Sequence, residues 1–204
     1  MTFLIFQLIV LIFSVMVHEI AHGAAALTLG DETAKRAGRL TLNPLKHLDP
    51  FGSVILPLLL ALPVFFGGSA VIFGWAKPVP YNPQNLKNPK LGGGLIAAAG
   101  PISNLFLAAI FGGFLRLAPT LGLGAPLADL LSVIVILNIV LAIFNLVPIP
   151  PLDGSKILAM FLPARYYHYY YWLEIYGLII LLFFIFFFFP LLYPVIDWLY
   201  GILT

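Results

Sequence analysis

The sequence predicts an all-α, polytopic membrane protein, and two observations support this prediction. Hydrophobic residues make up 62% of the 204 positions, whereas charged residues make up only 9%. Soluble domains usually carry about 25% charged residues, so this chain has too few charges to cover a surface that faces water. The apolar residues also lie in long blocks, as helices that cross a bilayer require. We therefore expect a single integral-membrane domain over residues 1–204.

Four of these blocks are long enough to cross a membrane, which takes roughly 20 apolar residues. They cover residues 3 to about 29, 91–117, 127–147 and 172 to about 189. Gly30 is expected to end the first helix, and Pro190 is expected to break or kink the last one. The remainder, 191–204, is expected to form an interfacial or half-spanning helix.

A fifth apolar stretch, at about 51–75, is ambiguous because prolines and a glycine pair interrupt it. It could cross fully, or it could be a re-entrant, broken segment that returns to the side from which it came. In the re-entrant case nine of the ten Lys and Arg residues share one face, and Arg116 lies on the other. A full crossing would divide the ten basic residues equally. The positive-inside rule therefore favours the re-entrant interpretation, with the N-terminus outside the cell membrane.

Charge and cysteine content exclude several classes of function. The net charge of +2 is too small to indicate a nucleic-acid partner. The chain has no cysteine, which excludes disulfides, thiolate metal sites and cysteine nucleophiles. The first residues lack a basic region and a cleavage site, so we expect a retained first span rather than a signal peptide.

The first span contains the sequence His18-Glu19-Ile20-Ala21-His22, which has the pattern H-E-x-x-H. On a helix the i, i+4 spacing places both imidazoles on one face, where they can reach a single Zn²⁺. Glu19 would then lie close enough to the open metal position to take a proton from water. The alternative is that these are ordinary polar residues of a helix. Ionisable side chains are costly inside a lipid bilayer, so the functional interpretation is favoured.

A catalytic zinc takes three protein ligands and leaves a fourth position open, so one more ligand is needed. Asp153 follows three prolines that interrupt the apolar sequence after Asn145, and broken backbone at membrane depth is tolerated where it lines a polar cavity. Taken alone, Asp153 would more often be the N-cap of a helix starting at Gly154. Together with H-E-x-x-H the ligand interpretation is preferred. His47 is expected to be solvated or capping, and His168 to belong to an aromatic belt.

Five segments carry a resemblance to a known family: HEIAHG in the first span, LTLNPLKHLDP at 40–50, FGWAKPVP at 73–80, GPISN at 100–104 and NLVPIPPLDG at 145–154. They resemble the site-2 family of intramembrane zinc metalloproteases, in its short prokaryotic branch without PDZ or CBS modules. Ser155 departs from this pattern, since a second glycine is common at its position.

The resemblance implies that His18, His22 and Asp153 are ligands of one Zn²⁺ per chain and that Glu19 is the catalytic acid and base. It also implies that Asn145 and Asn104 support the site or the substrate. The alternatives are a hydrogen bond at a helix terminus for Asn145, and packing of small residues between helices for the glycine of GPISN.

The expected activity is hydrolysis of a peptide bond in or near a transmembrane segment of another membrane protein. A membrane zinc transporter or sensor is an alternative, although it would have no need of Glu19. A scaffold that binds membrane proteins without cleaving them is another. Zinc binding requires His18, His22 and Asp153 at one depth, which only the re-entrant topology provides. The active site is then expected near the cytoplasmic face.

Overall fold

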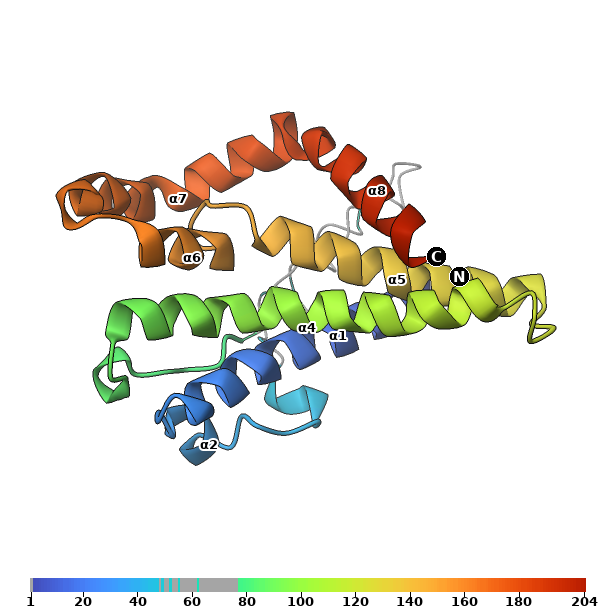
Figure 1. The fold of residues 1–204 in the computed structure, drawn as a ribbon, viewed down its shortest axis with the longest axis horizontal. Helices are drawn as coiled ribbons and strands as arrows, with labels where there is room; N and C mark the ends of the chain where they lie inside the picture. The colour runs from blue at the N-terminus through green and yellow to red at the C-terminus, as the bar shows by residue number, and fades with distance from the viewer. Residues whose placement is uncertain (1, 48, 50–51, 53–54, 56–61, 63–76) are drawn as a thin grey trace.

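The computed structural model describes residues 2–47, 49, 52, 55, 62 and 77–204, and all regular structure in this part of the chain is helical. Figure 1 shows the arrangement of the helices. In chain order they are α1 (Thr2–Thr28), α2 (Thr33–Arg36), η1 (Pro44–Lys46), η4 (Pro83–Asn85), α4 (Pro89–Leu117), α5 (Ala125–Asn145), α6 (Asp153–Phe161), η5 (Ala164–Tyr166), α7 (Tyr167–Phe187), η6 (Phe189–Leu192) and α8 (Tyr193–Leu203).

Four helical segments are long and apolar enough to cross a membrane, which confirms the predicted number of spans. They are Phe3–Thr28, Pro89–Leu117, Ala125–Asn145 and Ala164–Phe187. The last begins eight residues earlier than predicted, because the aromatic cluster after residue 165 forms the first turns of the helix instead of preceding it. This chain is therefore a multi-pass membrane protein.

Local sequence signals explain where the spanning helices begin and end. Gly30 has a φ of +100° directly after α1, as expected for a glycine that ends a helix. At the start of α4 the Asn88 side chain accepts a hydrogen bond of 3.0 Å from the Leu91 N–H, and Pro89 occupies the first helical position. Pro148, Pro150 and Pro151 follow the end of α5, because proline cannot continue a helix.

Helices α1, α4 and α5 form the centre of the fold, with α4 packed against α1, α5 and α6 (Figure 1). α8 turns back and packs on α4 and α5, where Ile196 joins the buried cluster of Ala108, Val135 and Ile139. A shorter apolar helix thus follows the last span, as predicted. α7 makes few contacts with the other helices, and its side chains are largely exposed.

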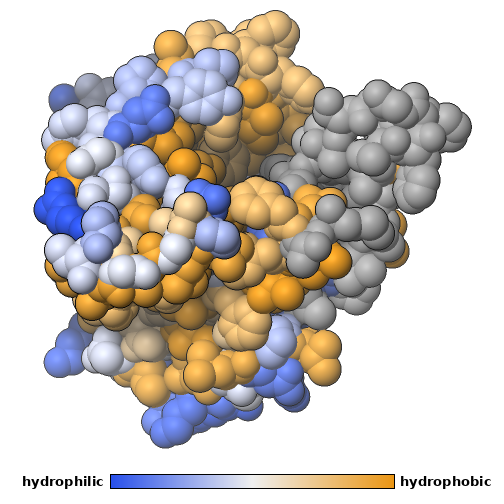
Figure 2. All heavy atoms as spheres, turned by 90° about the vertical axis from the view of Figure 1, so that its right-hand side faces the viewer, coloured by the Kyte–Doolittle hydropathy of each residue, from blue (hydrophilic) through white to orange (hydrophobic). Residues whose placement is uncertain are grey.

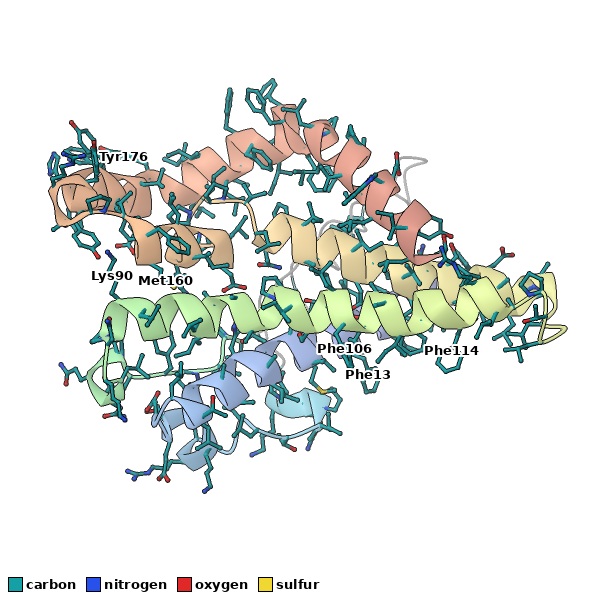
Figure 3. All side chains as sticks on the ribbon, viewed as in Figure 1. Phe13, Lys90, Phe106, Phe114, Met160 and Tyr176 are labelled. Carbon is teal, nitrogen blue, oxygen red and sulfur yellow. The ribbon has the colours of Figure 1, made fainter. Side chains whose placement is uncertain are left out.

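Large hydrophobic side chains project outward along the spans. Phe13, Phe106 and Phe114 are 49%, 66% and 51% exposed and point away from the bundle (Figure 3). Hydrophobic residues also occupy a broad area of the face shown in Figure 2. Soluble proteins rarely expose apolar surface on this scale, whereas lipid tails are its natural solvent.

α1 ends at the same end of the fold where α4 begins (Figure 1). Asp31, just after α1, accepts hydrogen bonds from the Asn82 N–H at 2.7 Å and from Asn85 Nδ2 at 2.6 Å. Nearby, the Lys77 N–H donates to the His47 carbonyl at 2.9 Å. The re-entrant interpretation requires this proximity, although the stretch 51–75 itself lies almost entirely outside the described residues.

Candidate metal centre

Helix α1 presents two histidines on one face, as the i, i+4 spacing predicts. The rings of His18 and His22 meet edge to face, with 4.6 Å between their centroids. His18 lies ten residues before the end of α1 at Thr28, which is about 15 Å along the helix axis. The two imidazoles therefore lie within the span and nearer to the end where α1 leaves it.

Asp153 reaches the same point from the other half of the sequence. It is the first residue of α6, and Leu152 rather than Asp153 occupies the N-cap position, so the N-cap alternative is wrong. Its Oδ2 lies 3.0 Å from His18 Nε2 and 3.2 Å from His22 Nε2. Asp153 is 8% exposed and His18 is 6% exposed. The polar atoms of all three residues are thus held together inside the protein.

The other ring nitrogen of each histidine already has a partner. His22 Nδ1 donates to the backbone carbonyl of Ile96 at 2.7 Å, and His18 Nδ1 donates to Asn104 Oδ1 at 2.6 Å. A neutral imidazole that carries its proton on Nδ1 has a free lone pair on Nε2. Both histidines therefore direct Nε2 lone pairs toward Asp153, the arrangement in which an imidazole binds a metal.

The donor set and its spacing fit Zn²⁺. Zinc sites combine imidazole nitrogens with a carboxylate oxygen at about 2.0–2.2 Å in tetrahedral geometry, so neighbouring ligand atoms lie roughly 3.3 Å apart. The two distances from Asp153 Oδ2 are close to this value, and the ligand atoms of the three residues lie within 4.8 Å of one another. Three protein ligands leave a fourth position for water or substrate.

The backbone of α4 closes one side of the group at Gly100. A Cβ atom at this position would lie 2.5 Å from His18 Nε2 and 2.5 Å from His22 Cε1. Any side chain would therefore collide with both imidazoles. Packing between helices is one explanation of this glycine, and its packing partners are the two histidines.

Glu19 lies beside the histidines and is fixed by a loop. Its Oε2 accepts a hydrogen bond of 2.8 Å from the backbone N–H of Val79. Val79 is buried between Pro78 and Pro80, neither of which has an N–H to offer. Sequence reasoning could not identify this partner, because the donor is a backbone group far along the chain.

Asn104 is fully buried and contacts His18, so the structure brings it to the metal centre. Asn145 instead donates from Nδ2 to the Leu141 carbonyl at 2.9 Å, one turn back in its own helix. His168 accepts a hydrogen bond from Trp172 Nε1 in the aromatic start of α7, as expected. His47 is the C-cap of η1, as one of the two alternatives predicted, and it is not solvated, since it is 2% exposed and donates to the Thr41 carbonyl at 2.9 Å.

Sequence reasoning missed two further residues that are joined to this group. Asn138 of α5 accepts a hydrogen bond of 2.9 Å from Asn104 Nδ2 and donates one of 2.9 Å to Ser14 Oγ. Asn138 is an isolated polar residue in the interior of an apolar span, and polar residues in such positions usually have a specific partner. That signal is present in the sequence, although Asn138 is neither an acid nor a histidine and so is not a candidate zinc ligand.

Comparison with known proteins gives a consistent picture. The sequence model described as "Peptidase family M50" matches residues 119–188. "Putative zinc metalloprotease YwhC" of Bacillus subtilis is 43% identical over 164 residues, which cover 78% of this chain and 69% of that protein. No solved structure matches.

Two mycobacterial relatives are more distant. "Putative zinc metalloprotease Rip2" of Mycolicibacterium smegmatis is 31% identical over 141 residues, 69% of this chain and 51% of that protein. The protein of the same name in Mycobacterium tuberculosis is 30% identical over 155 residues, 71% of this chain and 52% of that protein. The chain thus spans about half the length of these two relatives.

Proposed function

Because the chain belongs to peptidase family M50, the site-2 type of membrane zinc metalloprotease, we propose that it cleaves a transmembrane segment of another protein. The scissile peptide bond lies in or near that segment. His18, His22 and Asp153 hold one Zn²⁺, and Glu19 acts as general base and then as general acid. The observation that carries this proposal is the convergence of two imidazole Nε2 atoms on Asp153 Oδ2, at 3.0 and 3.2 Å.

The zinc, when bound, makes water a stronger acid and polarises the scissile carbonyl. Glu19 accepts the proton of the attacking water and passes it to the leaving amine. The Val79 N–H holds one carboxylate oxygen of Glu19, which leaves the other free to accept that proton. Asn104 and the Ile96 carbonyl keep the two imidazoles oriented.

The substrate has to expose its backbone before it can react. A helical transmembrane segment hides its carbonyls in its own hydrogen bonds, so the segment unwinds locally and binds in an extended form. An extended strand can be held by pairing with an exposed backbone edge. The polar loop at 31–42 and the segment at 51–75 are the proposed edges, and Asn145, at the end of α5, supports the substrate beside Asp153.

We also propose an orientation in the cell membrane, with the N-terminus outside and the site near the cytoplasmic face. Lys35, Lys87 and Arg165 belong to the end of the fold where α1 finishes and α4 and α7 begin (Figure 1). Arg116 belongs to the opposite end, where it donates to the Ile202 carbonyl at 3.0 Å. The excess of basic residues favours the first end as the cytoplasmic one.

The test pairs zinc content with cleavage of a co-expressed single-span model substrate, measured for the same membrane preparations. Glu19→Gln keeps the shape of the side chain and an oxygen that can accept from the Val79 N–H, but a carboxamide does not accept the catalytic proton. We expect full zinc content and a loss of turnover of about 10²–10⁴-fold. His18→Ala is the comparison, and it should lose both metal and cleavage.

Unchanged turnover in Glu19→Gln would remove Glu19 from the mechanism. A zinc transporter or sensor would tolerate this substitution, because its work ends at binding the metal. The pair of measurements therefore separates a peptidase from the metal-binding alternatives.

A further inference from the structure

Asn138 is fully buried in α5, and no role in the reaction has been given to it so far. A carboxamide inside a membrane protein is costly unless its donors and acceptor are paired. All of its polar atoms form hydrogen bonds, either with neighbouring helices or with its own helix. We asked what this pairing achieves.

The orientation of the Asn138 carboxamide is fixed by its surroundings. Its Nδ2 donates to the Ile134 carbonyl at 2.9 Å and to Ser14 Oγ at 2.9 Å. A backbone carbonyl can only accept, so the NH₂ group has to face Ile134. Oδ1 therefore faces α4, where it accepts from Asn104 Nδ2 at 2.9 Å.

Asn104 is oriented in turn by this contact. Its Nδ2 donates to Asn138 Oδ1 and to the Ser14 carbonyl, the latter at 3.2 Å. Its Oδ1 is then left facing His18 Nδ1 at 2.6 Å. If the carboxamide of Asn104 were reversed, an NH₂ group would face the N–H of His18, and two acceptors would face an oxygen.

The two histidines differ in how their rings are held. His22 donates to a backbone carbonyl, which cannot reverse its polarity. His18 donates to a side-chain carboxamide, whose two ends have nearly the same shape but opposite hydrogen-bonding character. The oxygen of Asn104 is kept toward His18 by the two acceptors of its Nδ2, which are Asn138 Oδ1 at 2.9 Å and the Ser14 carbonyl at 3.2 Å.

We propose that Asn138 is a positioning residue for the zinc site, which keeps the Asn104 oxygen toward His18 Nδ1 and thereby leaves His18 Nε2 free for the metal. The proposal rests on the assignment of His18, His22 and Asp153 as zinc ligands. Ser14 contributes both its hydroxyl and its backbone carbonyl, so α1, α4 and α5 are all involved. Asn138 touches neither the metal ligands nor the reacting atoms.

The experiment measures zinc affinity by competition with a chelator, and the absorption spectrum of the cobalt-substituted full chain in detergent. Asn138→Leu has a similar volume but no acceptor for Asn104. We expect it to lower the zinc affinity about tenfold and to alter the cobalt spectrum, because partners outside the ligand set typically change affinity by about 10–100-fold. Asn138→Asp, whose carboxyl stays protonated in this apolar surrounding, retains an acceptor oxygen for Asn104 and one donor for the Ile134 carbonyl, and we expect it to bind zinc as the wild type does.

Val135→Ala is the structural control. Val135 is also 0% exposed in α5, one turn before Asn138, and it packs in an apolar cluster. This substitution should lower the thermal stability and leave zinc affinity and the cobalt spectrum unchanged. If Asn138→Leu does not give folded protein, Asn138→Ser replaces it, because its shorter hydroxyl does not reach Asn104.

The proposal is overturned if Asn138→Leu, or Asn138→Ser in its place, has wild-type zinc affinity and an unchanged cobalt spectrum. It is equally overturned if the Asp variant loses as much affinity as the Leu variant, since the acceptor would then be irrelevant. Failure of the ligand assignment gives a different result, in which His18→Ala binds zinc as tightly as the wild type.

Discussion

Glu19 Oε2 and the backbone N–H of Val79 are joined by a hydrogen bond of 2.8 Å that spans 60 positions of the sequence. Val79 also packs against Gly23, where a Cβ atom would lie 2.9 Å from Val79 Cγ1. The loop at 77–80 thus packs directly against the turn of α1 that follows Glu19, the proposed general base. This contact determines where the Glu19 carboxylate lies, and it can be removed by one substitution.

Val79→Pro deletes the N–H while keeping a residue that suits the extended backbone between two prolines. We expect zinc content to be unchanged and turnover of the model substrate to fall at least tenfold. A hydrogen bond to a charged group contributes about 1.5–3 kcal/mol, and about 1.4 kcal/mol corresponds to a factor of ten in rate. Val79→Ala is the control, because it shortens the side chain but retains the N–H. Equal turnover in the two variants would show that the N–H is not needed.

Gly100→Ala should damage the metal centre although none of the proposed ligands is substituted. The added methyl group would lie 2.5 Å from His18 Nε2, so the imidazoles or α4 have to move. We expect a loss of zinc affinity, measured by competition with a chelator. Gly113→Ala is the matched control on the same helix, because a Cβ atom there meets nothing within 4 Å. Equal zinc affinity in the two variants would contradict the role given to the α4 backbone.

The proposed topology can be tested by labelling single cysteines, because the chain has none of its own. Cysteine at positions 35, 87 or 165 should be inaccessible to a membrane-impermeant maleimide added to intact cells, whereas cysteine at position 120 should react. All four positions are exposed at the ends of helices. Thr120 is used in preference to Gly122, whose φ of +65° disfavours a side chain. Labelling of position 87 from outside would show that the proposed orientation in the membrane is wrong.

Asp31 should make the fold sensitive to acid. Burial raises the pKa of this carboxyl, but hydrogen bonds from Thr33, Asn85 and the Asn82 N–H outweigh burial and lower the pKa below its ordinary value. Its contribution to stability is complete above the pKa of an unfolded aspartate, about 3.9, and is lost as pH falls through the lower folded pKa. Thermal unfolding in detergent should therefore show a melting temperature that drops in this range.

Asp31→Asn should lower the stability by about 1–3 kcal/mol at neutral pH and weaken this dependence on pH. An amide cannot accept from all four donors, which are the N–H and hydroxyl of Thr33, the Asn82 N–H and Asn85 Nδ2. Glu32→Gln is the control at the next position. Its pair with Arg36, at 3.1 Å, is exposed, and exposed pairs contribute about 0–1 kcal/mol. A melting temperature of Asp31→Asn that equals the control's at every pH would refute this role.

The sequence predicted much of this architecture because lipid imposes simple rules. The ends of the first three spans were predicted to within two residues, since the apolar blocks end there and Gly30 marks the end of the first. The start of the last span was misplaced, because tyrosines and His168 lower the apolar character of its first turns. Hydropathy alone does not distinguish a helix end that lies in the headgroup region from a loop.

For the site, motif chemistry predicted which side chains would meet, and the structure brings His18, His22 and Asp153 together. It could not predict what holds them in place. The partner of Glu19 is a backbone N–H, and the partner of His22 is a backbone carbonyl, so neither has a signature in the sequence. The pairing of Asn104 with Asn138 depends on the rotation of α4 and α5 about their axes, which an almost uniformly apolar sequence does not reveal.

The contact between His18 and Asp153 has a consequence for biosynthesis, because 135 positions separate them along the chain. Ribosomes add about 5–20 residues per second, so roughly 7–27 seconds pass between synthesis of the first histidine and that of the carboxylate. During this interval the nascent chain already contains H-E-x-x-H in its first helix but lacks the third ligand. The proposed zinc site is therefore completed late in translation, after α4 and α5 have been synthesised, and we expect a chain released before Asp153 is added to be unable to complete it.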